Sequence, residues 1–498
     1  MRSYQKFKSF FYLVLVFQNL LFFQVLLGAN KSEILKIEDI NDNKKELLKT
    51  NIYKNTKDNT KELTINFKSI EDILINKNLE LKKASKAIDE ANLNLNLVKS
   101  RYNLKIDLDS TIPEYLSGKN YDPLLNLESS QISSSTSLGI TIPLYDPVRQ
   151  PEINSAIEKI NIAKDKYEKI KKDLILEASR RFIVFVNAYQ ETENGNQSVN
   201  LSLLNLQDAK ARFENGIGTK LDLLEAQIQL NKDQQFLIDK DNNFKSADNA
   251  LKSILYIDDD FDFVFNKDTS IYGWWDYSLE KNILFGKKNS IDLKNIESNK
   301  LIRLSESKIA KAKTMPSFFI KNESTATFSE GESLVAEVDK EAYQNSYNNT
   351  ISLNFSWDIF DGGISRTESQ NSNLQAKIED LNYKIESNFL KEEIINRYKI
   401  LKADEKKIFI SRKELDAAIE AMKLSRLRLN NGVATQREVI NSQKDLTAAK
   451  STFYKNIANY NISLISLKRL TGLALSGLCE STDIQTEKNK ICFYGEFD

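Results

Sequence analysis

The stretch RFENGIGTKLDLLEAQIQL (Arg212–Leu230) has a second version in the same chain, RLRLNNGVATQREVINSQKDL (Arg426–Leu446). The positions that match are Arg212, Asn215, Gly216, Thr219, Gln227 and Leu230, which fall on Arg428, Asn431, Gly432, Thr435, Gln443 and Leu446. Upstream, SLGITIPLYDP (Ser137–Pro147) pairs with SLNFSWDIFDG (Ser352–Gly362) at almost the same separation. A duplication that keeps a strand-like piece and a helix-like piece in order predicts two copies of one structural unit.

The composition favours long helices and argues against several function classes. The chain has 498 residues but only 15 Gly and 6 Pro, which is few for a turn-rich β protein. Lys+Arg and Asp+Glu are equal at 70 each, so nucleic-acid binding has no electrostatic support. The chain has no histidine, which excludes histidine-based nucleophilic, acid–base and zinc sites. We therefore expect no enzyme, no cofactor and no metal site.

Residues 1–29 are typical of a secretory signal peptide. A basic start precedes an apolar stretch over residues 10–27, and Ala29 offers a small residue for cleavage. The alternative is a membrane-spanning anchor, because the stretch is nearly long enough to cross a bilayer. Polar residues interrupt the stretch and favour cleavage: Gln18, Asn19 and Gln24. Residues 30–66 are polar and weakly periodic, which predicts a flexible lead-in.

The tail, residues 474–498, contains the only two cysteines, Cys479 and Cys492. In an exported protein their proximity predicts one local disulfide, which would add ~3 kcal/mol to the stability of the tail. The alternative is a metal pair, but no further ligands lie nearby.

The first repeat, residues 67–256, alternates between helical and strand-like patterns. We expect a helix over 67–102, strands around 104–108 and 138–144 with a polar loop between them, a long helix from Asp146-Pro147 to Asn215, and a return helix over 219–256. About sixty helical residues correspond to a rod of ~90 Å. An irregular linker, residues 257–289, follows, in which Trp274 and Trp275 are expected to pack rather than to stack on a ligand.

The second repeat, residues 290–473, follows the same plan. We expect a helix over 291–314, a strand after Pro316, a polar loop over 328–348, a strand over 351–359, a long helix that ends at Asn431, and a last helix that ends near Leu470. The return helices carry apolar residues every seven positions, which is coiled-coil spacing, although an ordinary antiparallel helical hairpin would look the same: Leu223, Leu230, Leu237, Phe244 and Leu251, then Val439, Leu446, Phe453, Tyr460 and Leu467.

The four strands pose a problem for a soluble fold. Four short strands cannot bury both edges of a sheet. Alternating apolar and polar residues suit strands that face lipid on one side and water on the other, and in lipid such a sheet has to close. Four strands per chain could close only through oligomerisation. The alternative is a small soluble sheet packed on the helices.

The chain resembles the TolC-like outer-membrane efflux proteins from about Phe67 to Leu473. The resemblance rests on the order and spacing of the two helix reversals, the two strand-to-helix junctions, ITIPLYDP (Ile140–Pro147) and FSWDIFDGG (Phe355–Gly363), and the ending YNISLISLKRLTGL (Tyr460–Leu473). It implies a mainly α fold with a small β part, in a homotrimer. Each chain would give four strands to a twelve-stranded β-barrel in the outer membrane of a Gram-negative cell. The long antiparallel coiled-coil helices would form a periplasmic α-barrel.

The resemblance also implies the function and partners. The protein would be a passive exit duct of a tripartite efflux or type I secretion system. It would meet a periplasmic membrane-fusion adaptor and, through it, an inner-membrane pump of the RND, ABC or MFS type. Drug and protein cargo remain open. A rival class, a non-channel periplasmic coiled-coil scaffold or adhesin, explains the heptads but not the strands placed identically in both copies.

Two sets of residues match the family's functional positions at the reversals. The candidates for adaptor binding are Arg212, Gly216, Thr219, Arg428, Gly432 and Thr435. Alternatively, the glycines only permit a tight reversal and the arginines cap helix ends.

The family's pore gate carries over in part. Asp222 falls on the family's gate aspartate, whereas Leu429 and Ala434 stand where a tyrosine and an arginine would be. A ring of Glu438 carboxylates is the best remaining gate candidate, and such a ring would favour cations. The alternative is that Glu438 is an ordinary exposed helix residue.

Overall fold

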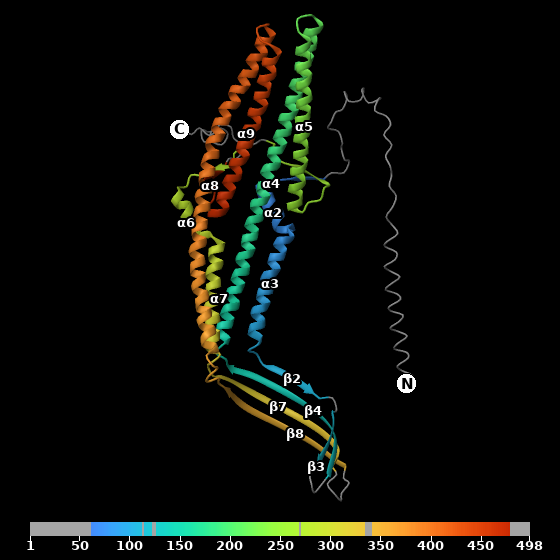
Figure 1. Cartoon of the computed structure of the whole chain (residues 1–498), viewed down its shortest axis with the longest axis vertical. Coiled ribbons are helices and arrows are strands. Elements are labelled where there is room, and N and C mark those ends of the chain that lie inside the picture. The colour runs from blue at the N-terminus through green and yellow to red at the C-terminus, as the bar shows by residue number, and fades with distance from the viewer. Residues whose placement is uncertain (1–60, 112–113, 122–125, 268–269, 334–340, 479–498) are drawn as a thin grey trace, which may run out of the picture. The chain divides into compact units, whose positions relative to one another are not determined.

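The computed structural model describes residues 61–111, 114–121, 126–267, 270–333 and 341–478 (Figure 1). The predicted signal peptide and the cysteine pair, Cys479 and Cys492, lie outside the described residues.

The described part of the chain repeats one order of elements, with one additional strand in the first repeat (Figure 1). The first repeat consists of α2 (Phe67–Lys77), α3 (Leu79–Ser100), β2 (Lys105–Ser110), β3 (Glu114–Tyr121), β4 (Asn126–Tyr145), α4 (Arg149–Glu214) and α5 (Lys220–Leu255). The second consists of α6 (Leu279–Asn289), α7 (Ile291–Ala312), β7 (Ser317–Ser333), β8 (Glu341–Ser356), α8 (Ile364–Asn430) and α9 (Gln436–Thr471). Two small ladders complete the fold: β1 (Lys61–Thr64) with β5 (Phe261–Val264), and β6 (Gly273–Trp274) with β9 (Gly477–Leu478).

An aspartate lies just before each of the two longest helices. Helix α4 has 66 residues and α8 has 67, so each is ~100 Å long. Asp146 Oδ1 accepts a hydrogen bond from Val148 N at 2.8 Å just before α4. Asp361 accepts from Gly363 N at 3.0 Å and from Ser365 N at 2.8 Å at the start of α8. Asp361 therefore satisfies an N–H group that the start of α8 leaves unpaired, whereas the N-cap residue of α4, Val148, makes no side-chain capping hydrogen bond.

The expectation of one helix over 67–102 is wrong, because the chain breaks at Asn78. Asn78 ends α2 and begins α3 with an extended backbone, and its side chain accepts from Leu81 N at 3.0 Å. Ser290 plays the same part between α6 and α7. The segment 257–289, expected to be irregular, therefore contains helix α6. Short polar side chains that bond the nearby backbone compete with helix continuation in this way.

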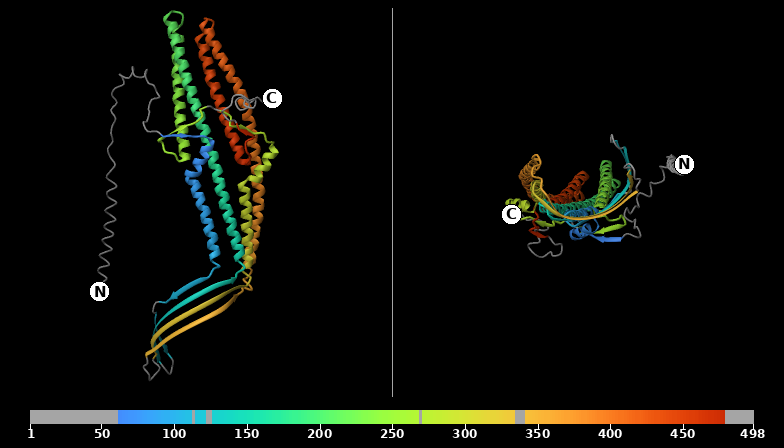
Figure 2. Two further views of the ribbon diagram at one scale, coloured as in Figure 1. Left: turned by 180° about the vertical axis from the view of Figure 1, so that it is seen from behind. Right: turned by 90° about the horizontal axis from the view of Figure 1, so that it is seen from below.

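The main sheet is antiparallel, in the order β2-β4-β7-β8, with β3 pairing beside β2 along the far part of β4. The sheet is curved across its strands (Figure 2). Its strands are longer than expected: β4 has 20 residues, β7 has 17 and β8 has 16. Both predicted polar loops, around Gly118 and over 328–348, therefore contain strand residues. These stretches lack an apolar alternation, and their backbone groups are paired by the neighbouring strands.

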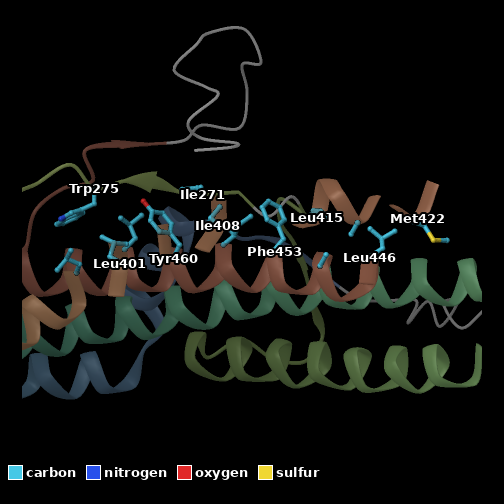
Figure 3. Packing of buried hydrophobic residues seen from close by; sticks show 14 of the residues in the cluster. Ile271, Trp275, Leu401, Ile408, Leu415, Met422, Leu446, Phe453 and Tyr460 are labelled. Carbon is cyan, nitrogen blue, oxygen red and sulfur yellow. The ribbon is translucent and has the colours of Figure 1, made fainter. Parts of the chain in front are cut away.

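Each repeat has its own apolar core. In the second repeat, Leu401, Ile408, Leu415, Met422 and Leu429 recur every seven residues along α8 and are all buried against α9 (Figure 3). The predicted heptad of α9 is buried throughout, which confirms its coiled-coil packing. In the first repeat, α4 and α5 share a core with Ile70 and Leu74 of α2.

One of the two linker tryptophans, Trp275, belongs to the second core. Trp275 is buried there and donates from Nε1 to Asn282 Oδ1 at 3.0 Å. This confirms that Trp275 packs, as expected. Among the helices of the described residues, none combines the length and apolarity that crossing a membrane requires.

Candidate functional site at the two helix reversals

The two reversals have the same backbone geometry. Gly216 and Gly432 have φ of +74° and +75°, and a Cβ added to either would meet nothing within 4 Å. Ile217 N donates to Arg212 O at 2.9 Å, and Val433 N donates to Arg428 O at 2.9 Å. This closure satisfies carbonyls at the helix end and requires a left-handed residue. Glycine is therefore needed at both positions for its backbone alone.

The two threonines begin the return helices. Thr219 and Asp222 form a capping box, in which Asp222 N donates to Thr219 Oγ1 at 3.1 Å and Thr219 N donates to Asp222 Oδ2 at 3.0 Å. Thr435 Oγ1 accepts from Glu438 N at 3.3 Å. Glu438 Oε2 instead lies 3.6 Å from Arg428 Nη1. The two gate candidates, Asp222 and Glu438, occupy equivalent positions but have different partners.

The two arginines also differ. Arg212 Nη2 donates to the carbonyl of Leu429 at 3.1 Å and lies 3.5 Å from Asn430 Oδ1, so it joins the first reversal to the second. Arg428 stays within its own reversal and donates from Nη2 to Val433 O at 3.4 Å. Arg212 thus caps a helix end in the other copy, which the comparison of the repeats did not predict.

A further link between the reversals was missed. Arg437 of α9 forms an ion pair with Glu225 of α5, whose side chain is mostly buried. The carboxylate raises the pKa of the Arg437 guanidinium. In the repeat alignment Arg437 falls on Leu221 and Glu225 on Asn441, so neither partner is duplicated. A comparison of the two copies therefore gave no signal for this pair.

Next to the two helix reversals, which together form the tip of the molecule, the two repeats meet along a buried polar seam. The seam is formed by Ser198, Ser202 and Asn205 of α4, Asp233 of α5 and Gln443 of α9. The amide of Gln443 is fully buried. Its nitrogen lies 2.6 Å from Ser202 Oγ, 2.9 Å from Asp233 Oδ2 and 3.1 Å from Ser198 O. Its oxygen accepts from Asn205 Nδ2 at 2.6 Å. Buried polar groups are stable only with such partners.

The same line of contacts continues away from the tip. Ser198 and Thr447 hydroxyls lie 3.2 Å apart. Ser451 Oγ donates to the buried carboxylate of Glu191, which also pairs with Lys240 Nζ at 2.8 Å. Hydrogen bonds, rather than apolar contacts alone, therefore set the register of the first repeat against the second.

The helices also enclose a cavity of about 220 Å³ between α4, α8, α9 and the start of α7. Two ion pairs cross between the repeats beside it: Arg469 with Asp173 at 2.6 Å, and Lys169 with Asp292 at 2.5 Å. These two ion pairs brace the junction between the repeats. Among the described residues, no group of acidic, cysteine or histidine side chains could hold a metal ion.

The sheet has one apolar face and one polar face. The register places Ile142, Ile320 and Leu353 side by side, and next to them Tyr145, Phe318 and Phe355. Further along this face polar residues appear: Asn322 lies between Ile140 and Ile351, and Ser324 and Asn349 follow beside Leu138.

The opposite face carries charges. Lys105 lies 3.2 Å from Asp107, and Lys321 lies 2.7 Å from Glu323. Gly139 leaves room for the Asp107 carboxylate, because a Cβ there would lie 2.6 Å from its Oδ2. Such a two-sided sheet suits a boundary between an apolar medium and water.

Comparison with known proteins identifies the class of protein that this fold and these reversals define. A model of the outer membrane efflux protein family matches the chain twice, over residues 71–255 and 287–473. The chain belongs to the outer membrane efflux protein family. It is therefore an efflux channel protein and not an enzyme, which confirms the resemblance found in the sequence.

Solved structures of such channels share the fold. CusC is 13% identical with a TM-score of 0.67, over 82% of this chain and 92% of that chain. The CmeC outer membrane channel of Campylobacter jejuni is 15% identical with a TM-score of 0.65, over 82% and 85%. The outer membrane protein VceC of Vibrio cholerae is 12% identical with a TM-score of 0.63, over 82% and 96%. None of the curated proteins matches the chain.

Proposed function

We propose that this protein is the outer-membrane exit duct of a tripartite efflux or type I secretion system in a Gram-negative cell. It works as a homotrimer and conducts substrates passively. An inner-membrane pump of the RND, ABC or MFS type supplies the energy, and a periplasmic adaptor joins the pump to the duct. The single observation that carries this proposal is the sheet with an apolar and a charged face.

The dimensions of the apolar face fit the outer membrane. One end of this face has an aromatic row, in which Phe318 contacts Phe355 with ring centroids 5.1 Å apart. Phe328 lies on the same face of β7, ten residues further along, and is exposed. Ten residues at ~3.4 Å each, tilted by ~40°, span ~25 Å, which is the height of the apolar band in outer-membrane proteins. We assign this face to lipid.

The opposite face lines the aqueous path in this proposal. Its charged side chains, Lys105, Asp107, Lys321 and Glu323, are expensive to place against hydrocarbon and are favourable beside water. Among the described strands β2 and β8 lie at the edges of the sheet, so in this proposal the sheets of three copies join edge to edge.

The reversals are the surface proposed for the adaptor. Ile217 and Val433 follow the two glycines and are exposed by 77% and 64%. Exposed apolar residues at a rigid tip suit contact with another protein. Arg212, Thr219, Arg428 and Thr435 hold the two tips in shape, so their part in adaptor binding is to position these apolar residues.

Extraction and conductance test the proposal. The expected result is a protein released from membranes only by detergent, as a heat-sensitive trimer that conducts ions in planar lipid bilayers. A water-soluble monomer or dimer without conductance would overturn the proposal and favour the coiled-coil scaffold.

A further inference from the structure

The first repeat has an open cleft between α3 and α4, away from both helix reversals (Figure 1). Its volume is about 580 Å³, which lies within the range of small-molecule sites. Both helices contribute apolar side chains to its walls: Ala84 and Ala87 from α3, and Ile162, Ala163 and Ile170 from α4. These residues recur at helical spacing, so each set lies on one face of its helix. The cleft therefore offers an apolar surface to a ligand.

Positive charges without partners line this apolar surface. Lys83 of α3 and Lys159 and Lys166 of α4 belong to the walls of the cleft and are exposed. Within the described part of the chain, these three ammonium groups have neither an ion pair nor a hydrogen bond. The remaining charged residue of the walls, Glu80, lies in the first turn of α3, where a carboxylate stabilises the helix start. Because three lysines accompany one acid, the cleft attracts anions.

The equivalent place in the second repeat has opposite charges across its two helices. Helices α3 and α7 both have 22 residues, so Ala84 of α3 falls on the larger Ile296 of α7. One turn further along α7, Lys300 pairs with Asp380 of α8 at 2.7 Å. In the first repeat lysines lie on both helices instead, and like charges on facing helices repel one another. An anion between these lysines would remove the repulsion.

We propose that the cleft between α3 and α4 binds an anionic amphiphile, a molecule with a long apolar chain and one acidic head group, as in a fatty acid. The apolar chain lies against Ile162 and Ile170, and the head group lies between Lys83 and Lys166. Charge-assisted hydrogen bonds from the two ammonium groups hold the acid. This inference goes beyond the proposed function, because neither conduction nor adaptor binding requires a ligand at this cleft.

The walls of the cleft favour this ligand class over two others. A small soluble anion would pair with the lysines but would leave the apolar side chains in water. A neutral lipid would cover the apolar side chains but would leave the lysines without a partner. A molecule that combines an acid with an apolar chain satisfies both parts of the lining.

Photolabelling of the full-length protein in nanodiscs of neutral phospholipid tests the site. The probe is a palmitic acid analogue with a diazirine in its chain, and the alcohol of the same chain is the control probe. Mass spectrometry of the labelled peptides is expected to place the acid on α3 and α4 beside the cleft. The alcohol should label these peptides about fivefold less, because it has no charge to pair with the lysines. Equal labelling of the cleft by the two probes would overturn the recognition of an acid.

Removal of the three positive charges should weaken labelling by the acid about fivefold. The variant carries three substitutions in the walls of the cleft: Lys83→Gln, Lys159→Gln and Lys166→Gln. The matched control changes the net charge equally, at exposed lysines of the same helices that lie outside the cleft: Lys82→Gln, Lys164→Gln and Lys172→Gln. An equal loss of labelling in the two variants would show a general effect of charge and would overturn the site.

A filled cleft should lose the label without any change of charge. Ala87→Leu with Ala163→Leu enlarges two side chains of the apolar walls, and neither alanine is buried, so the helices keep their packing. Ser85→Leu with Asn161→Leu, at exposed positions of the same helices outside the cleft, is the control. Both variants should melt at the temperature of the unaltered protein. Undiminished labelling of the filled variant would overturn the site.

The outcomes separate this inference from the proposed function. A conducting trimer that the acid does not label at the cleft overturns the site and leaves the duct intact. Labelling that occurs only after heat has dissociated the trimer would mean that another copy covers the cleft, which also overturns the site. A water-soluble monomer that the acid labels on α3 and α4 keeps the site and overturns the duct.

Discussion

Arg212 of the first helix reversal donates a hydrogen bond from Nη2 to the backbone carbonyl of Leu429 in the second, at 3.1 Å. That carbonyl lies in the last turn of α8 and also accepts from Gly432 N at 3.0 Å. Arg212 is therefore a second donor at this helix end, and it joins the reversal of one repeat to that of the other.

Arg212→Ala should loosen the two tips and favour the open channel. The lost bond has a charged donor, so the change is about 1–2 kcal/mol in favour of separated hairpins. Planar-bilayer recordings should show larger or longer openings. Arg180→Ala, an exposed arginine on the same helix that pairs with Glu177, is the matched control. Unchanged openings in Arg212→Ala would mean that this bond does not hold the tips together.

Gln443→Leu should destabilise the protein by about 3 kcal/mol, because the buried Asp233 carboxylate loses a donor. Unfolding of the purified protein in detergent measures the change. The double variant Gln443→Leu with Asp233→Leu should recover part of the loss, since no buried charge is then left without its partner. The exposed Gln234→Leu on α5 is the control. A double variant less stable than the single one would contradict the role of Asp233.

Gly286→Ala should destabilise the packing of α6 on α8. The new Cβ would overlap the Cδ1 atom of Ile394, which is fully buried, and overpacking of this kind costs about 1–3 kcal/mol. Ile394→Val removes that atom and should restore stability in the double variant. Thermal unfolding of both single variants and the double variant measures the coupling. Additive losses would show that the two side chains do not compete for one space.

Acid should weaken the start of α8 through Asp361. Hydrogen bonds from Ser365 and Gly363 lower the pKa of this carboxyl. Its stabilising effect is therefore complete above the pKa of an unfolded Asp, ~3.9, and is lost as pH falls through the lower folded pKa. Asp361→Asn should lower the melting temperature at pH 6 and lose its effect near pH 2. Asp358→Asn, before the helix start, is the control. A difference that persists at pH 2 would contradict a charge effect.

Glu438→Gln should reduce the preference of the channel for cations. We propose a ring of these carboxylates as the gate, and Arg428 Nη1 lies 3.6 Å from Glu438. Arg428→Gln should therefore raise cation preference by removing the neighbouring positive charge. Reversal potentials under a salt gradient measure both effects. Asp222→Asn, at the equivalent capping position, is the comparison. If Glu438→Gln leaves the reversal potential unchanged, Glu438 is not the gate.

The long helices and both reversals could be predicted because their signals are local and occur twice. Gly216 and Gly432 require a left-handed backbone, and the heptad of α9 follows from residues seven positions apart on one helix. The break at Asn78 was missed because an Asn inside a helical pattern is compatible with continuation, and its capping bond to Leu81 is visible only in the structure.

The remaining misses come from contacts distant in sequence. The far part of β4 is rich in serine and carries no apolar alternation, so its pairing with β3 and β7 depends on neighbours that the local pattern does not name. Arg437 and Glu225 lie 212 positions apart and at unequal places in the repeats. Such a pair follows from the packing of α5 beside α9, and the sequence of neither repeat predicts it.

The polar seam has a mechanical consequence. Apolar side chains can slide along one another and find new contacts, but Gln443 has partners at only one longitudinal position. A slip of one helical turn, ~5.4 Å, would leave the Gln443 amide and the Asp233 carboxylate buried without these hydrogen-bond partners. Sliding of one repeat along the other is therefore unfavourable, whereas rotation about the seam moves Gln443 and its partners least. Any widening of the channel must therefore come from rotation of the helical hairpins about an axis near Gln443.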